Sequence, residues 1–120
     1  MVNTKLKPIL PSLREKKRYL VFELISKNRI EDAVLVSNAI MKYSLQFLGQ
    51  FGVAKAGIIV LNNKWDSSLQ RGIIKVSHKS IEALKAALVF ACKIENEDVI
   101  FRSVGVSGIL NKAERNILKI

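Results

Sequence analysis

The strongest constraint on the fold lies where a cluster of cations runs directly into an alternating apolar segment. Four of the five residues 14–18 are cations, and residues 19–25 then alternate along an extended chain. One face of this segment would carry Leu20, Phe22 and Leu24. The other face would carry Tyr19, Val21, Glu23 and Ile25. Because both faces are largely apolar, the pattern predicts a central strand with one face under helices and the other only partly open.

Charge is the unusual property of the composition. Twenty Lys and Arg residues stand against ten Asp and Glu residues in a chain of 120, which leaves a formal net charge of +10. A surplus of that size on a small protein attracts polyanions, nucleic acid first and anionic membranes second. No apolar run approaches the roughly 20 residues that span a bilayer, and the start of the chain has no secretory pattern. We therefore expect a cytoplasmic protein that does not contact membranes.

Length and local pattern predict one folded domain. Residues 1–12 show neither helical nor strand periodicity, so we expect a flexible basic N-terminal arm there. Residues 13–120 have the length of a single domain.

Two further strands are expected within this domain. β-branched residues predict strands over 53–61 and 71–77, and the segment 62–68 between them has turn chemistry.

The first helix is expected between the first two strands. Asn28 and Glu31 have the spacing of a capping box, which predicts a helix over residues 29–48. Gly49 and Gly52 would act as its stop signals.

The second helix is expected between the third and fourth strands. Either Ser77 or Ser80 could cap a second helix, which would end near Lys93. A polar turn then leads into a strand over 99–106, and a short terminal helix is expected over 112–119.

The predicted fold class is α+β. The order β-α-β-β-α-β is that of ferredoxin-like domains and RNA recognition motifs, an antiparallel four-stranded sheet with two helices on one face, here with an additional C-terminal helix. Because such crossovers are right-handed, the first and third strands should lie in the middle of the sheet.

No set of residues indicates an active site in this chain. His78 is the sole histidine and has no motif around it, and Cys92 is interpreted as a small apolar group inside a helix. Glu95, Glu97 and Asp98 form a carboxylate cluster that could bind Mg²⁺, or could simply be a solvated turn. We therefore expect no catalytic residues and no metal or cofactor bound by this chain.

Contact with RNA phosphates is the better supported interpretation. A sheet that stacks unpaired bases usually displays aromatic residues on its two central strands, and residues 71–77 contain none. Flexible cations outside the sheet suit the phosphates of a folded RNA, although a solvated charged surface is the alternative for the terminal helix. The predicted phosphate-binding residues are Arg14, Lys16, Lys17, Arg18, Arg102, Lys112, Arg115 and Lys119.

The partly open sheet face suggests a protein partner. An apolar patch of the expected size is larger than a soluble monomer normally exposes, so a partner should cover it. The predicted interface residues are Tyr19, Val21, Ile25, Ile73, Ile100 and Val104. Trp65, in the loop between two strands, is either a lid on the core or an exposed anchor at an interface.

Three separated motifs, in order, resemble the family of ribonuclease P protein component 2, the small archaeal subunit with relatives in eukaryotic nuclear ribonuclease P and in the mitochondrial-RNA-processing ribonuclease. The motifs are Arg14-Glu15-Lys16-Lys17-Arg18-Tyr19-Leu20-Val21-Phe22-Glu23, the segment 72–79 leading into residues 83–88, and Val104-Gly105-Val106-Ser107-Gly108 followed by residues 112–115. Together they extend over most of residues 13–115.

The resemblance implies a protein subunit of the ribonucleoprotein that removes the 5′ leader from precursor tRNA, an endonuclease whose RNA holds the active site and its Mg²⁺ ions. Its implied partners are the ribonuclease P RNA, protein component 3 and other ribonuclease P proteins, with precursor tRNA contacted indirectly. Two-plus-two assemblies with component 3, which contain a pair of this chain, are also implied. A chain in this role needs no acid, base or ligand set of its own.

Two other functions remain open from the residues alone. The first is a ferredoxin-like regulatory or dimerisation domain without an RNA role. The second is a stand-alone nuclease that uses Glu95, Glu97 and Asp98.

Overall fold

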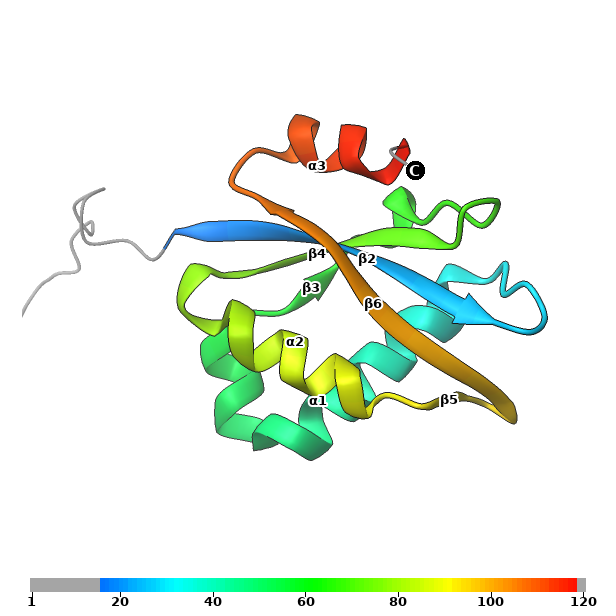
Figure 1. The fold of residues 1–120 in the computed structure, drawn as a ribbon. Coiled ribbons are helices and arrows are strands. Elements are labelled where there is room, and N and C mark those ends of the chain that lie inside the picture. The colour runs from blue at the N-terminus through cyan, green and yellow to red at the C-terminus, as the bar shows by residue number, and fades with distance from the viewer. Residues whose placement is uncertain (1–15, 119–120) are drawn as a thin grey trace, which may run out of the picture.

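The computed structural model describes residues 16–118, and within them the chain forms a five-stranded antiparallel sheet and three α-helices (Figure 1). The strands are β2 (Lys17–Ser26), β3 (Ile59–Val60), β4 (Arg71–Ser77), β5 (Lys93–Ile94) and β6 (Glu97–Ser107). The helices are α1 (Ala33–Ala56), α2 (Ile81–Phe90) and α3 (Leu110–Leu118), with short 3₁₀ turns at Asn62–Lys64 and His78–Ser80. The predicted N-terminal arm, Arg14 and Lys119 lie outside the described residues.

β2 is the middle strand of the sheet, as its two apolar faces predict. The strand order is β3-β4-β2-β6-β5, so β2 pairs with β4 on one side and with β6 on the other, both antiparallel. The described sheet has five strands where four were predicted, because residues 93–94 pair with 97–98 in a short hairpin. The predicted second helix correspondingly ends at Phe90 instead of near Lys93.

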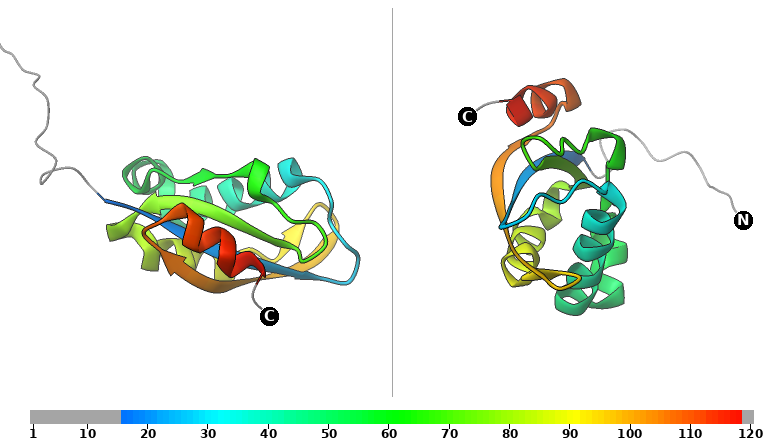
Figure 2. Two further views of the ribbon diagram at one scale, coloured as in Figure 1. Left: turned by 90° about the horizontal axis from the view of Figure 1, so that it is seen from above. Right: turned by 90° about the vertical axis from the view of Figure 1, so that its right-hand side faces the viewer.

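α1 and α2 cover one face of the sheet (Figures 1 and 2). Leu20, Phe22 and Leu24 are buried beneath them, as predicted for this side of the strand. Trp65 stacks on Phe22 with ring centroids 6.0 Å apart and packs against the same core. Trp65 therefore covers the core, the first of the two alternatives given by the sequence, and is not an exposed anchor at an interface.

α3 covers the opposite face, so the sheet is sandwiched between helices over part of its length (Figure 2). A second apolar cluster joins Val21 and Ile73 of the sheet to Ala113 and Ile117 of α3, and all four are buried. The expectation that this face is open is therefore wrong for Val21 and Ile73, because the chain's own terminal helix covers them. The short apolar stripe on α3 is a weak sequence signal, and this is why the cover was missed.

The first helix differs from its prediction at both ends. Asp32, and not Asn28, is the N-cap, and its side chain accepts a hydrogen bond from the backbone N–H of Val34. Gly49 does not end the helix but kinks it, with φ of 76° and ψ of 174°, and helical structure continues to Ala56. Gly57 ends it in the left-handed conformation that suits glycine. The strand predicted over 53–61 therefore shrinks to the two residues of β3.

Cys92 lies outside α2 and is exposed, so its interpretation as a small apolar group inside a helix is wrong. Its sulfur lies 3.9 Å from the Tyr43 hydroxyl. Across residues 16–118, no helix is both long enough and apolar enough to cross a bilayer.

Candidate nucleic-acid interface

Antiparallel pairing collects cations at the end of the sheet where β2 begins. Lys17 lies opposite Ser77 of β4, and Tyr19 lies between Lys75 of β4 and Ser107 of β6. One region therefore contains the start of β2, the last residues of β4 and β6, and the turn that opens α3. We call this region the basic end, and its described cations are Lys16, Lys17, Arg18, Lys75, Lys79, Lys112 and Arg115.

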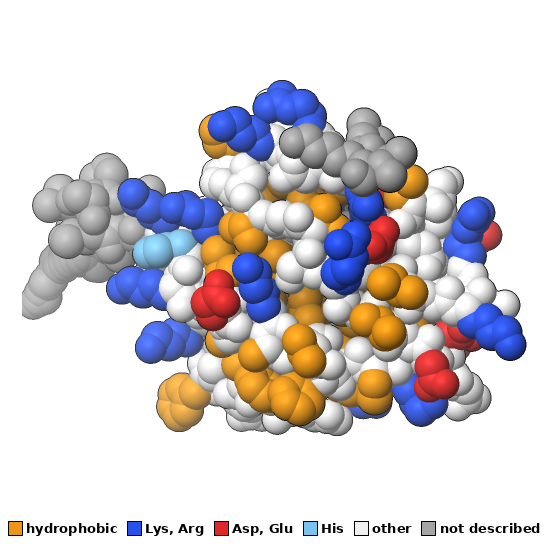
Figure 3. Space-filling model, in the orientation of Figure 1, with side chains coloured by type: hydrophobic (Ala, Val, Ile, Leu, Met, Phe, Trp, Pro, Cys, Tyr) orange, Lys and Arg blue, Asp and Glu red, His pale blue; other side chains and the backbone are white. Residues whose placement is uncertain are grey.

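Positive charge is distributed unevenly over the molecule. Figure 3 shows Lys and Arg side chains gathered around the start of β2 at the left and over α3 at the top. Glu95, Glu97 and Asp98 lie in the hairpin at the other end of the sheet. A surface with charge of one sign concentrated at one end attracts a polyanion to that end and orients it there.

Five of the predicted phosphate-binding residues lie at the basic end: Lys16, Lys17, Arg18, Lys112 and Arg115. The structure brings them together although the two groups are separated by most of the chain. Lys75 and Lys79 were missed by sequence reasoning. Lys75 lies within an apolar strand and carries no signal until the strand register places it opposite Tyr19. Lys79 follows in the 3₁₀ turn after β4.

Arg102 is placed differently from the other predicted phosphate-binding residues. Its guanidinium donates two hydrogen bonds to Glu23 Oε1, at 2.9 Å from Nε and 2.6 Å from Nη2. Arg71 donates to the other carboxylate oxygen of Glu23 at 3.3 Å and to the backbone carbonyl of Ile117 in α3 at 3.0 Å. The hydrogen bonds from Arg102, followed by that from Arg71, hold the pKa of the Glu23 carboxyl below its ordinary value, against the opposing effect of burial. Arg102 therefore belongs to an ion-pair network that fastens α3 to the sheet.

The predicted partner-interface residues divide into two groups. Val21 and Ile73 are sealed under α3, while Tyr19 and Val104 pack partly against the same cluster. Ile25 and Ile100 face each other across β2 and β6 and remain exposed, at 46% and 62%. Of the six residues, only Ile25 and Ile100 are exposed on the sheet face that was predicted to meet a partner.

The helical layer carries further exposed apolar side chains. Phe47 of α1 and Phe90 of α2 stack with ring centroids 5.0 Å apart, yet both remain exposed. Phe51, beyond the kink at Gly49, is 95% exposed. We call Phe47, Phe51, Val89 and Phe90 the aromatic patch. Sequence reasoning missed it because Phe47 fits the apolar spacing of a core-facing helix; the positive φ of Gly49 that redirects the helix cannot be deduced from that spacing.

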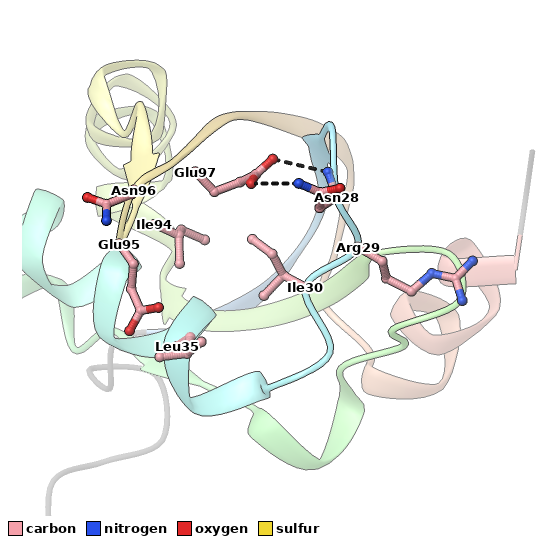
Figure 4. A pocket seen from close by; sticks show the side chains of 8 residues that line it. All are labelled: Asn28, Arg29, Ile30, Leu35, Ile94, Glu95, Asn96 and Glu97. Atoms are coloured by element: carbon pink, nitrogen blue, oxygen red, sulfur yellow. Dashed lines mark hydrogen bonds between the residues drawn. The ribbon is translucent and has the colours of Figure 1, made fainter.

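The three carboxylates of the alternative nuclease hypothesis do not converge. Glu97 accepts hydrogen bonds from the backbone and side-chain N–H groups of Asn28, at 3.0 and 3.2 Å (Figure 4). These bonds hold the pKa of Glu97 below its ordinary value, the backbone bond contributing most. Asp98 instead pairs with Lys93. Figure 4 shows Glu97 directed toward Asn28 and Glu95 lying apart from it, across a hollow of about 300 Å³. Among residues 16–118, no three His, Cys, Asp or Glu side chains are grouped to hold a metal ion.

The fold and the surface define a small α+β protein with a strongly basic end. The chain belongs to the Rpp14/Pop5 family, whose profile matches residues 18–118. It is 38% identical to ribonuclease P protein component 2 of Thermococcus gammatolerans over 95% of this chain and 92% of the relative. The corresponding protein of Pyrococcus abyssi is 33% identical over 95% of this chain and 94% of its own length. The resemblance seen in the sequence motifs is thereby confirmed.

A solved structure shares the fold. A chain in the cryo-EM structure of yeast ribonuclease MRP superimposes with a TM-score of 0.64, covering 81% of this chain and 77% of that one, at 12% sequence identity. At that identity the likeness concerns the fold alone.

Proposed function

We propose that this chain is a non-catalytic protein subunit of ribonuclease P, the ribonucleoprotein that removes the 5′ leader from precursor tRNA. Membership of the Rpp14/Pop5 family, together with relatives named ribonuclease P protein component 2, is the observation that carries the proposal. The strand order is compatible with a ferredoxin-like sheet to which β5 adds an edge strand. Mg²⁺ and the chemistry of cleavage would belong to the RNA, in the cytoplasm of the cell.

The chain would contact RNA through phosphates and not through stacked bases. α3 occupies the part of the sheet where aromatic residues would otherwise meet unpaired bases, and Tyr19 is itself partly buried against the α3 cluster. The cations of the basic end would lower the repulsion between closely packed RNA helices. Their long side chains suit phosphates, which carry most of the affinity and its salt dependence.

The basic end is tested by the triple variant Lys16→Ala, Lys17→Ala, Arg18→Ala. We expect weaker binding to the ribonuclease P RNA and a salt slope that falls by about one for each phosphate that the variant no longer neutralises. A matched control is the triple variant Lys27→Ala, Lys42→Ala, Lys85→Ala, which also removes three cations but from outside the basic end. An RNA affinity of the triple variant equal to that of the control variant would contradict this assignment.

The protein partner is proposed to be component 3, in an assembly that can contain two copies of each chain. Two apolar surfaces could serve it: the aromatic patch on the helices, and Ile25 with Ile100 on the sheet. The aromatic patch supports the proposal better, because exposed aromatic side chains are typical of the energetically dominant residues of interfaces. The sheet pair is flanked by the charged network of Glu23 and Arg102.

Two variants separate these surfaces. Phe51→Ala removes a side chain that is 95% exposed, so it should leave stability nearly unchanged while weakening the complex with component 3. Ile100→Ala is the comparison on the sheet face. Mass measurement of each mixture gives the composition of the complex, and unaltered binding by Phe51→Ala with weakened binding by Ile100→Ala would transfer the interface to the sheet.

A ferredoxin-like regulatory or dimerisation domain without an RNA role is the alternative. It predicts that the chain binds folded RNA no better than other basic proteins do, in a shift assay at moderate salt. The stand-alone nuclease finds no support in the arrangement of Glu95, Glu97 and Asp98 described above.

A further inference from the structure

The side chains of α3 have three different environments: the sheet below the helix, an ion pair on one flank, and the surface around Lys112 and Arg115. Its underside, Ala113 and Ile117, is buried on the sheet. On one flank Glu114, the only acidic residue of the helix, forms an ion pair of 2.5 Å with Lys64 from the turn that follows β3. Lys112 and Arg115 have no ion pair among the described residues. Because Glu114 is already paired with Lys64, it does not neutralise these two cations.

A hollow of about 320 Å³ lies between α3 and the end of β6. It is lined by Val106, Ser107, Lys112, Arg115 and Asn116, so two cations and no carboxylate border it. Its volume is roughly ten times that of a water molecule in the liquid, which is enough for a hydrated tetrahedral anion. The sides of the hollow are held in place by the packing of α3 on the sheet and by the Ser107 hydroxyl, which bonds to the backbone of Ile109.

Gly105 leaves room for the neutral donor beside this hollow. The side-chain nitrogen of Asn116 lies 3.2 Å from the point where a Cβ on Gly105 would stand, so the missing side chain makes room for the amide. The amide offers N–H donors beside the two cations. Arg18 reaches Gly108, in the turn between β6 and α3, with its Nη1 3.5 Å from the corresponding Cβ position.

We propose that this hollow binds one phosphate group of an RNA backbone, held jointly by Lys112, Arg115 and Asn116. The inference deepens the proposed function and rests on it. Cationic donors together with a neutral amide are the groups that recognise phosphate oxygens by charge-assisted hydrogen bonds. A single shared phosphate distinguishes this hollow from a row of independent surface cations, each of which would meet a phosphate of its own.

The test compares Lys112→Ala, Arg115→Ala and the double variant in binding to ribonuclease P RNA across a range of salt concentrations. Both side chains are exposed, so the variants should fold normally, and the circular dichroism spectrum checks this. If one phosphate is shared, the double variant lowers the salt slope by about one. Asn116→Ala should reduce the affinity several-fold while the salt slope stays constant, because the amide carries no charge. Lys42→Ala is the matched cation control.

A decrease of about two in the slope, the sum of equal single decreases, would mean two separate phosphates and would overturn the proposal. Provided that the wild-type chain binds the RNA, an unchanged salt slope in the double variant would also overturn the proposal. If the wild-type chain fails to bind the RNA at all, the proposed function itself is wrong. Titration with inorganic phosphate, followed by the side-chain NMR signal of Asn116, distinguishes the two phosphate sources: a weaker shift than with RNA is expected, and a phosphate affinity equal to that for RNA would contradict recognition of an RNA backbone.

Discussion

Ile117 tests the most consequential feature of the fold, the packing of α3 on the sheet. Its side chain is 6% exposed and belongs to the cluster with Val21, Ile73 and Ala113. Replacing a buried isoleucine by alanine costs about 2–5 kcal/mol, and we expect about 3 kcal/mol because a terminal helix can partly collapse onto the cavity. For a chain of this size such a cost corresponds to a decrease in melting temperature of about 10 °C.

Ile109 provides the control in the same segment. It is also an isoleucine, but 54% exposed, so Ile109→Ala should change the free energy of unfolding by no more than about 0.5 kcal/mol. Urea denaturation followed by circular dichroism measures both variants. Because Lys112 and Arg115 are held by the same helix, Ile117→Ala should also weaken RNA binding although it removes no charge. Equal stability of the two variants would refute the inference that α3 is an integral cover of the sheet.

Three further perturbations test the local chemistry. The pKa of the Glu23 carboxyl is held below its ordinary value of 4.5, so its contribution to stability is present above that pH and is lost as the pH falls below it. The difference in urea midpoint between wild type and Glu23→Gln should therefore shrink as the pH is lowered below about 4.5, and a difference that stays constant with pH would contradict this. Gly72→Ala would place a Cβ 2.8 Å from Phe22 Cζ and 3.1 Å from Trp65 Cε3. This crowding should lower the free energy of unfolding by about 1–3 kcal/mol and shift the fluorescence of Trp65. Unchanged stability would mean that the two rings can move to accommodate the added methyl group. Asp32→Ala removes the cap of α1 and should cost about 1 kcal/mol in thermal unfolding, whereas Glu31→Ala, which has no capping contact, should be nearly neutral.

Sequence periodicity was sufficient where a residue's environment depends on its immediate neighbours. The alternation of residues 19–25 predicted both the central strand and the burial of Leu20, Phe22 and Leu24. Periodicity was insufficient where contacts between residues far apart in the sequence determine the local structure. Asn28 resembles a capping residue, but Glu97, from the far hairpin, accepts its hydrogen bonds, and the Ile30 N–H that follows is held by Gln70.

The candidate site shows the same division. The cluster around residues 16–18 is visible in the sequence because its cations are contiguous. Lys75 becomes part of the basic end through strand register, and Lys79 through the turn that follows β4. Arg102 lies opposite Glu23 in the middle of β6, where the two side chains form an ion pair. The covering of Val21 and Ile73 depends on the direction in which the chain turns after Gly108, which no local pattern specifies.

The central claim, that this chain is a working subunit of ribonuclease P, is tested most directly by reconstitution. Catalytic RNA and component 3 from Thermococcus gammatolerans, whose component 2 is 38% identical to this chain, would be combined with and without this chain. Cleavage of precursor tRNA at its 5′ leader would then be measured across Mg²⁺ concentrations. We predict that adding the chain lowers the Mg²⁺ concentration required for cleavage, because its cations offset repulsion between RNA phosphates. Cleavage with the same Mg²⁺ dependence in the presence and absence of the chain would contradict this role.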